Sequence, residues 1–215
     1  MSGPGRNETQ RRLIDVASRM FADGSVDGVS IRSITREADV GPAAVHYHFR
    51  SKDGLLDAVL ERHGRRVTEE IVERGRALDR SPDRPTARAV VESVALPYFE
   101  LLAREPISGA EWLQIVAQRA GTDDLRTSRV TGVVIADLHS RVRACFPGQP
   151  EERSLQATIV AVRSLLSLVS RVPADPAERE ASREIIIDFI AGGLTAAITG
   201  RRPTTAAYAA VESTG

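Results

Sequence analysis

The chain of 215 residues has 42% hydrophobic and 27% charged residues, with 29 basic and 29 acidic side chains and therefore no formal net charge. This composition is typical of a globular protein of one or two domains, and it excludes a disordered chain and any general attraction to nucleic acid. Its one cysteine, Cys145, excludes an intramolecular disulfide, and the N-terminus lacks the apolar segment of a signal peptide. We therefore expect a cytoplasmic protein.

The first predicted helix begins at Asn7 and ends at about Asp23. Asn7 followed three residues later by Gln10 matches a capping box, and we expect residues 1–6 to be disordered. Apolar residues at helical spacing give this helix one face for burial. We expect it to pack behind the two helices that follow.

The most informative stretch is Ser30 to Leu56, which predicts two short helices, a tight corner and the start of a third helix. Ser30 and Ser51 are suitable N-caps for the first and third of these helices. Gly41 tolerates unusual backbone angles, and Pro42 is suited to the first position of the second helix. Two short helices with such a corner predict a helix-turn-helix, whose second helix can enter a DNA major groove.

The same stretch resembles the DNA-binding region of the TetR family of transcriptional regulators. The matching parts are S-I-R-S-I-T-R-E-A, V-G-P-A-A-V-H-Y-H-F and R-S-K-D-G-L-L, within Asn7 to Leu60. The triplet Tyr47-His48-Phe49 followed by Ser51-Lys52 is the most distinctive portion. The resemblance implies an all-α fold in which three N-terminal helices bind DNA and the remaining helices dimerise and bind a ligand.

Several residues of the helix-turn-helix are candidates for DNA contacts. His46 and Tyr47 would face the groove or its phosphates, and Lys52 at a helix N-terminus would bind a phosphate. The small residues before them would let the helix approach closely and contact thymine methyl groups. The full candidate set is Ser30, Arg32, Arg36, Gly41, Pro42, Ala43, Ala44, His46, Tyr47, His48 and Lys52.

Some of these candidates also have an alternative interpretation that involves no DNA. Arg32 and Arg36 could be ordinary solvated charges, and one histidine with the tyrosine could pack in a small core. Metal binding by His46 and His48 is disfavoured, because residues two apart on a helix do not share a face.

The rest of the chain predicts further helices, which makes about nine in total. One runs from Ser51 to about Leu78, and a proline-containing linker follows it. The later predicted ranges are Ala87 to Arg104, Ser108 to Ala120, Asp123 to Phe146, Glu151 to Val172, and a last helix that Asp175 caps and Gly200 ends. The predicted domains are 1–56 for DNA binding and 57–200 for ligand binding and dimerisation, with a flexible tail at 201–215.

The resemblance also implies a four-helix seam between two copies of the chain, formed by the last two long helices of each. The candidates for this dimer interface are Ile159, Val162, Leu166, Val169, Ile186, Phe189, Ile190, Gly193 and Ala197. A monomer core is the alternative interpretation of the same apolar residues. An apolar ligand pocket among the middle helices is implied as well, with Tyr98, Trp112, Gln118, His139 and Arg163 as its polar candidates.

Together these observations predict a ligand-responsive regulator, most simply a homodimeric repressor that binds a palindromic operator and that a small-molecule effector releases. No cofactor and no metal are expected. The alternatives are a regulator without ligand control and an all-helical enzyme or carrier. An enzyme is disfavoured, because no nucleophile elbow, phosphate loop or metalloprotease motif is present.

Overall fold

The computed structural model describes residues 4–122 and 131–200, and these residues form helices without any strand. The all-α prediction is therefore confirmed. In the described ranges the helices are α1 (Pro4–Asp23), α2 (Ile31–Glu37), α3 (Ala43–Phe49), α4 (Lys52–Asp79), α5 (Ala87–Arg104), α6 (Pro106–Thr122), α7 (Thr131–Cys145), α8 (Glu151–Val169) and α9 (Pro176–Thr199).

The capping residues predicted most of the helix starts correctly. The side chains of Ser51 and Asp175 accept hydrogen bonds from backbone amides in the first turns of α4 and α9. Gly200 ends α9 in a left-handed conformation, with φ of 70°. The prediction for the first helix was wrong, because α1 already begins at Pro4 and Asn7 therefore lies inside it.

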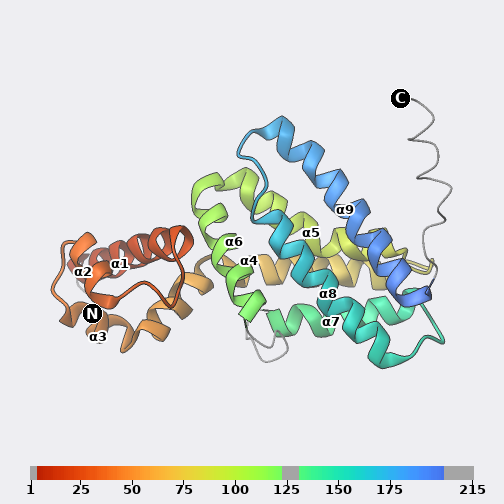
Figure 1. The fold of residues 1–215 in the computed structure, drawn as a ribbon, viewed down its shortest axis with the longest axis horizontal. Coiled ribbons are helices and arrows are strands. Elements are labelled where there is room, and N and C mark those ends of the chain that lie inside the picture. The colour runs from red at the N-terminus through yellow and green to blue at the C-terminus, as the bar shows by residue number, and fades with distance from the viewer. Residues whose placement is uncertain (1–3, 123–130, 201–215) are drawn as a thin grey trace.

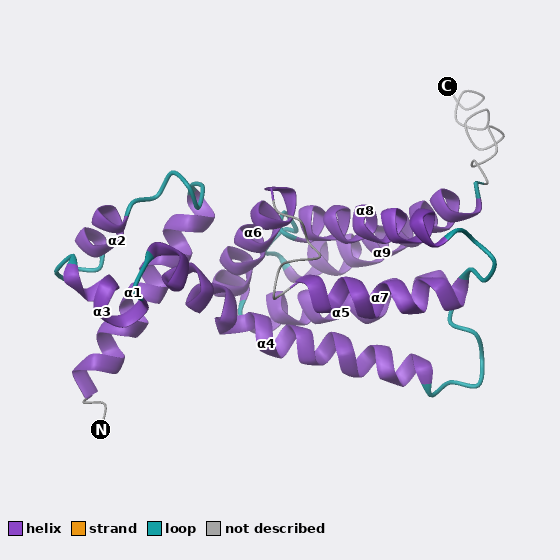
Figure 2. Cartoon of the chain, turned by 90° about the horizontal axis from the view of Figure 1, so that it is seen from below, coloured by secondary structure: helices purple, strands orange, loops and turns teal. Residues whose placement is uncertain are grey.

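The chain divides into two packed regions, each with its own apolar core (Figure 1). We call α1, α2, α3 and the start of α4 up to Val59 the head, and the described residues from Leu60 onward the body. The head core includes Leu13, Phe21 and Ile34, all of which are fully buried. In the body, α5 and α7 pack against α4, and α8 and α9 cover α5 and α7 on the side away from α4 (Figure 2).

The long helix α4 belongs to both regions. Its first turns place Leu55, Leu56 and Val59 in the head core, whereas Val67 and Ile71 lie in the body core. Leu60 packs against both cores. The predicted domain limits at residues 56/57 and 200/201 stay predictions, and α4 crosses the first of them without a break.

Helix α6 ties the two regions together a second time. Ile115 of α6 is fully buried in the head core, although its neighbours Leu113 and Val116 lie in the body core. The amide nitrogen of Gln118 donates to the carbonyls of Phe21 and Gly24, each at 3.2 Å. Nothing in the sequence pattern indicated that α6 contributes to the head.

The far end of α4 is fixed to α7 by Arg141, which is only 6% exposed. Its guanidinium donates to the carbonyl of Gly75 at 3.0 Å, and to the carboxylates of Asp79 and Asp137. A Cβ atom at Gly75 would lie 2.3 Å from the guanidinium carbon of Arg141. A larger residue there would displace the guanidinium of Arg141, so the close approach of the arginine, and not the backbone of α4, favours glycine.

No helix in the described ranges is long and apolar enough to span a membrane. The predicted disorder of residues 1–3, the flexible tail at 201–215 and the start of a helix at Asp123 all fall outside the described residues. Residues 4–6, which were expected to be disordered, belong to α1.

Candidate nucleic-acid interface

Helix α2 begins with a reciprocal cap made by two serines. The Oγ of Ser30 accepts from the backbone amide of Ser33 at 3.1 Å, and the backbone amide of Ser30 donates to the Oγ of Ser33 at 3.2 Å. This confirms Ser30 as the N-cap. Its hydroxyl is already engaged in capping, so any contribution to phosphate binding comes from its position at the start of α2.

The corner between α2 and α3 differs from the prediction in one respect. The residue in the left-handed region is Asp39, with φ of 51°, whereas Gly41 has no positive φ. Aspartate tolerates this conformation better than most residues with a side chain. A Cβ at Gly41 would meet no atom within 4 Å, and Pro42 is the N-cap of α3 and not its first residue.

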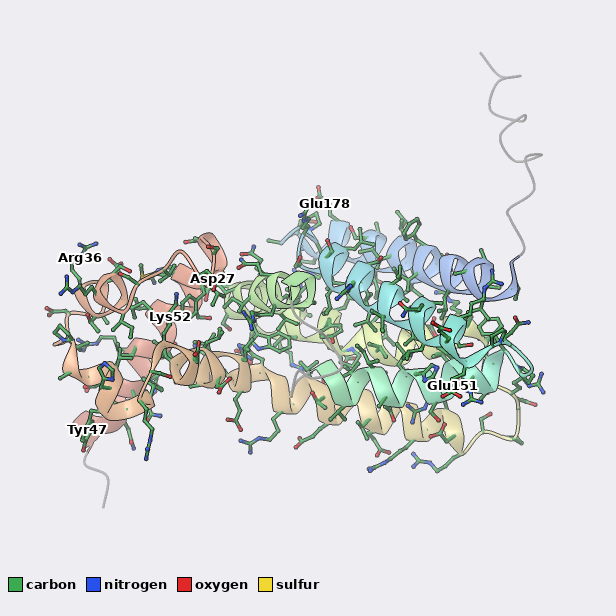
Figure 3. All side chains as sticks on the ribbon, turned by 60° about the horizontal axis from the view of Figure 1, so that its bottom comes forward. Asp27, Arg36, Tyr47, Lys52, Glu151 and Glu178 are labelled. Atoms are coloured by element: carbon green, nitrogen blue, oxygen red, sulfur yellow. The ribbon has the colours of Figure 1, made fainter. Side chains whose placement is uncertain are left out.

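Helix α3 separates its side chains into a buried and an exposed face. Val45 and Phe49 are buried in the head core, as their spacing predicted. Tyr47 is 64% exposed, and its ring contacts that of the half-buried His48 edge-on, with centroids 5.0 Å apart. Figure 3 shows Tyr47 and Arg36 at the end of the head that points away from the body. Gly41, Pro42 and Ala43 are exposed and Ala44 is half-buried, so the start of α3 has little side-chain bulk.

His46 and Arg50 close the end of α3 with two hydrogen bonds. The backbone amide of Arg50 donates to the carbonyl of His46 at 3.2 Å, and the Nδ1 of His46 lies 2.8 Å from the carbonyl of Arg50. Arg50 itself has φ of 70° and ψ of −37°, a conformation that costs a non-glycine residue about 1 kcal/mol. Its side chain is exposed and directly follows α3 in the chain.

Lys52 lies in the first turn of α4, where its ammonium group donates to the carbonyl of Asp27 at 3.2 Å (Figure 3). It therefore braces the loop between α1 and α2. An ammonium has three N–H donors, so this one bond leaves capacity for a phosphate oxygen.

The exposed arginines of the head fall into two groups. Arg12 and Arg19 each lie within 4 Å of a carboxylate, and Asp15 of α1 is paired with Arg62, just beyond the head on α4. In the described part of the chain Arg11, Arg32, Arg36 and Arg50 are exposed and have no such acidic partner. Sequence reasoning did not select Arg50, and its position directly after α3 was the available signal.

The predicted dimer surface is only partly exposed. Val162, Leu166, Val169 and Ile186 are buried in the core of the single chain, as the monomer-core alternative expects, and their place in a dimer interface stays a prediction. The apolar pattern of α8 and α9 covers more than half of each helix, and periodicity alone cannot tell which stripe faces the core. Ile159 is half-buried against that core.

A different apolar stripe of α8 and α9 faces outward. Its most exposed members are Val160 at 60%, Ile185 at 69% and Phe189 at 66%. Between the two helices lies a groove of about 400 Å³, with Ile190 on its floor and Phe189, Gly193 and Ala197 along one side. Cβ atoms added at Gly192 or Gly193 would meet nothing within 4 Å, so this surface is open.

The five predicted pocket residues do not form one site. Tyr98 and Trp112 are buried together in the body core, with ring centroids 6.4 Å apart, and burial raises the pKa of Tyr98. Gln118 is occupied with α1, and the exposed Arg163 donates to the carbonyl of Ala120 at 3.0 Å. His139 is half-buried on α7, and its Nε2 has no hydrogen-bond partner among the described residues.

Sequence reasoning missed His63, which lies where α4 enters the body. The ring is 6% exposed, its Nε2 has no partner among the described residues, and its Nδ1 is 3.9 Å from Glu105. Desolvation lowers the pKa of His63 below its ordinary value, and the attraction of Glu105 opposes this effect. The indole of Trp112 packs edge-on against the ring and donates to the carbonyl of Leu60 at 2.8 Å.

Comparison with known proteins also points to the region that contains α2 and α3. Residues 13–59 match the model of the bacterial regulatory proteins of the tetR family. The chain is 28% identical over 190 residues to the HTH-type transcriptional regulator BetI of Burkholderia mallei (strain NCTC 10229), a match that covers 86% of this chain and 94% of that protein. It is 34% identical over 127 residues to the HTH-type transcriptional regulator Mb3439c of Mycobacterium bovis, which covers 55% of this chain and 64% of that protein.

The fold as a whole also has a solved counterpart. A TetR-like transcriptional regulator from Rhodococcus sp. RHA1 superimposes with a TM-score of 0.57 at 15% sequence identity, over 87% of this chain and 96% of that chain. At this identity the likeness concerns the arrangement of helices, which extends over head and body alike.

Proposed function

Because the chain belongs to the TetR family of DNA-binding transcriptional regulators, we propose that it is a homodimeric repressor of a palindromic operator, from which a small-molecule effector releases it. The observation that carries this proposal is the exposed end of the head. There the outer face of α3 lies beside arginines that have no acidic partner in the described structure. A cytoplasmic location follows, because the operator is chromosomal DNA.

In this proposal α3 enters the major groove. Its small first residues allow a close approach of the helix, and Tyr47 and His46 project from its exposed face. Arg32, Arg36 and Lys52 would contact phosphates on either side of the groove, and Arg50 joins them as a fourth cation. Ser30, Gly41, Pro42, Ala43, Ala44 and His48 remain as proposed supporting contacts.

Dimerisation is proposed through the outward stripe of α8 and α9. The exposed side chains of Val160, Ile185 and Phe189 are costly to leave in water, and a second copy of the same stripe would bury them. Two-fold symmetry would then place two α3 helices on half-sites about 34–36 Å apart. This arrangement explains why a palindrome is the expected operator.

The effector is proposed to bind within the body near Tyr98 and Trp112. Both α4 and α6 pass from that region to the head, and Trp112 is hydrogen-bonded to α4 itself. A ligand that tilts either helix would change the distance between the two heads of the dimer. It can do so only by binding the DNA-incompetent state more tightly than the competent one.

The test is a selection of genomic DNA fragments on the purified protein, followed by titration of the retained fragments at several salt concentrations. We expect recovery of a common palindrome that is bound at least about a thousandfold more tightly than bulk DNA. Tyr47→Ala should weaken this binding without unfolding the dimer. Retention without sequence preference, or no retention, would contradict the proposal.

The same preparation separates the alternatives. A regulator without ligand control would bind the palindrome, yet no compound from a broad small-molecule screen would shift its melting temperature. A carrier or enzyme with an incidental helix-turn-helix would bind or turn over a small molecule and show no affinity for DNA.

A further inference from the structure

The hydrogen bond between His46 and Arg50 determines which nitrogen of the imidazole carries the proton. A carbonyl oxygen can only accept, so the Nδ1 of His46, at 2.8 Å from the carbonyl of Arg50, must be the donor. In the neutral ring the other nitrogen, Nε2, then has no hydrogen and is an acceptor. The structure thus fixes a single tautomer at the exposed end of α3.

The Nε2 of His46 is available for a partner outside the chain. The side chain is exposed, and Nε2 has no hydrogen-bond partner in the described part of the chain. Nδ1 faces the backbone at the end of α3, and the hydrogen-bonding directions of the two nitrogens, which flank Cε1, diverge widely. Nε2 is therefore directed away from the helix end and toward solvent.

The acceptor character of Nε2 excludes one of the two partners that the sequence left open. Phosphate oxygens only accept hydrogen bonds, so a neutral His46 in this tautomer cannot bind the DNA backbone directly. In the major groove the available donors are the N6 amino group of adenine and the N4 amino group of cytosine. Guanine and thymine present acceptors at the corresponding positions, which would face the lone pair of Nε2 unfavourably.

We propose that His46 is a specificity-determining residue that accepts a hydrogen bond from the exocyclic amino group of an adenine or a cytosine in the operator half-site. This inference rests on the proposed function, since it requires α3 to lie in the major groove. It assigns direct base recognition to a side chain whose tautomer is set by the strained residue after the helix. The small residues at the start of α3 can offer only backbone groups and methyl contacts.

The experiment is a thermodynamic cycle between the protein and the DNA. The operator selected by the wild-type protein is synthesised with one adenine at a time replaced by nebularine, which lacks the N6 amino group, or one cytosine replaced by 2-pyrimidinone, which lacks the N4 amino group. Binding of wild type and His46→Ala is measured at about pH 8. Arg36→Ala serves as the matched control for a side chain that is expected to contact a phosphate.

We expect one symmetric pair of positions at which removal of the amino group weakens wild-type binding about fivefold and leaves His46→Ala binding unchanged. Arg36→Ala should keep the full sensitivity to that base, because the loss of a phosphate contact weakens binding to every DNA sequence by a similar factor. Equal sensitivity of wild type and His46→Ala at every position would overturn the inference. So would a loss in His46→Ala that is accompanied by a shallower salt dependence, since that indicates a phosphate contact.

Two further measurements keep the outcomes distinct. The melting temperatures of wild type and His46→Ala show whether loss of the hydrogen bond to Arg50 has loosened α3, and the scan of modified bases on the wild-type protein requires no protein variant. A wild-type scan in which no amino group matters would refute the role of His46 while leaving operator binding intact. Failure of the wild-type protein to select any palindrome would remove the proposed function, and this inference with it.

Discussion

Two arginines of the body and three of the head have opposite surroundings. In the body Arg141 is buried and held by two carboxylates and two carbonyls, and the half-buried Arg88 bridges α5 to Glu184 and Asp188 of α9. In the head Arg32, Arg36 and Arg50 are exposed without an acidic partner in the described structure. The zero net charge of the chain conceals this difference, because Arg141 and Arg88 are neutralised by carboxylates, whereas Arg32, Arg36 and Arg50 are available to an external anion.

The largest difference in stability is expected between substitutions at two glycines of the head, Gly54 and Gly41, which look equivalent in the sequence. A Cβ at Gly54 would lie 2.0 Å from the backbone carbonyl oxygen of Phe49, whereas one at Gly41 would meet nothing within 4 Å. We expect Gly54→Ala to lower the free energy of unfolding of the head by about 3 kcal/mol or more, and Gly41→Ala to change it by at most about 0.5 kcal/mol. Urea denaturation of both variants measures this. Equal stability of the two would show that α3 and α4 are not so closely apposed.

The next largest effect is expected when one arginine from each region is replaced by methionine. Arg141→Met should lower the free energy of unfolding by about 2 kcal/mol, because it leaves the carboxylate of the mostly buried Asp137 without its partner. Its operator binding should keep the wild-type salt dependence. Arg36→Met should leave stability within about 0.5 kcal/mol and reduce the slope of log K against log salt by about 0.9, the amount for one phosphate. An exchange of these two phenotypes would refute the contrast between head and body.

A smaller effect is expected at Arg50, which combines a strained backbone conformation with an exposed positive charge. Arg50→Gly should raise the free energy of unfolding of the head by up to about 1 kcal/mol, because glycine adopts a φ of 70° without steric cost. The same variant should bind the operator more weakly and with a shallower salt dependence. Arg50→Asn is the control, since it also tolerates positive φ and likewise lacks the charge. A gain in both stability and DNA affinity would exclude Arg50 from the interface.

The smallest effect concerns the junction of the two regions and its dependence on pH. Burial lowers the pKa of His63 in the folded protein below that of the unfolded chain, so the unfolded state binds the extra proton first as pH falls. Stability should therefore decrease as the pH drops from about 7 through the ordinary imidazole range. His63→Gln should lack this part of the decrease. The groups that face the ring are Glu105, Arg62, Arg66 and Arg104.

Glu105→Gln provides the matched control for that measurement. Of the four facing groups, only Glu105 stabilises the protonated ring, so its removal should lower the pKa of His63 further and steepen the loss of stability on acidification. Denaturation at a series of pH values, with His63→Gln as the reference, separates this contribution from the other titrating groups. A profile of Glu105→Gln that matches wild type would show that the two residues are not coupled.

Much of the head was predictable, because its signals are local. Ser30 and Ser51 are caps that contact amides three residues away, and Val45 and Phe49 share a face at helical spacing. The same local reasoning failed at Asn7, where α1 extends further, and at Gly41, where the left-handed residue is Asp39. In both cases the residue pattern offered a plausible local solution, and the chain adopts another.

The sequence by itself therefore determined that the chain is helical, where most helices begin and end, and that a helix-turn-helix stands near its N-terminus. Caps, turns and helical periodicity are decided within a few residues, so they can be predicted from order along the chain. Only the tertiary structure decided which apolar stripe of α8 and α9 is covered, that Gln118 holds α1, and that Arg141 holds Gly75. Such contacts join residues that are far apart in the sequence, 94 residues in the case of Gln118 and Gly24, and no local pattern records which distant partner folding will bring to each side chain.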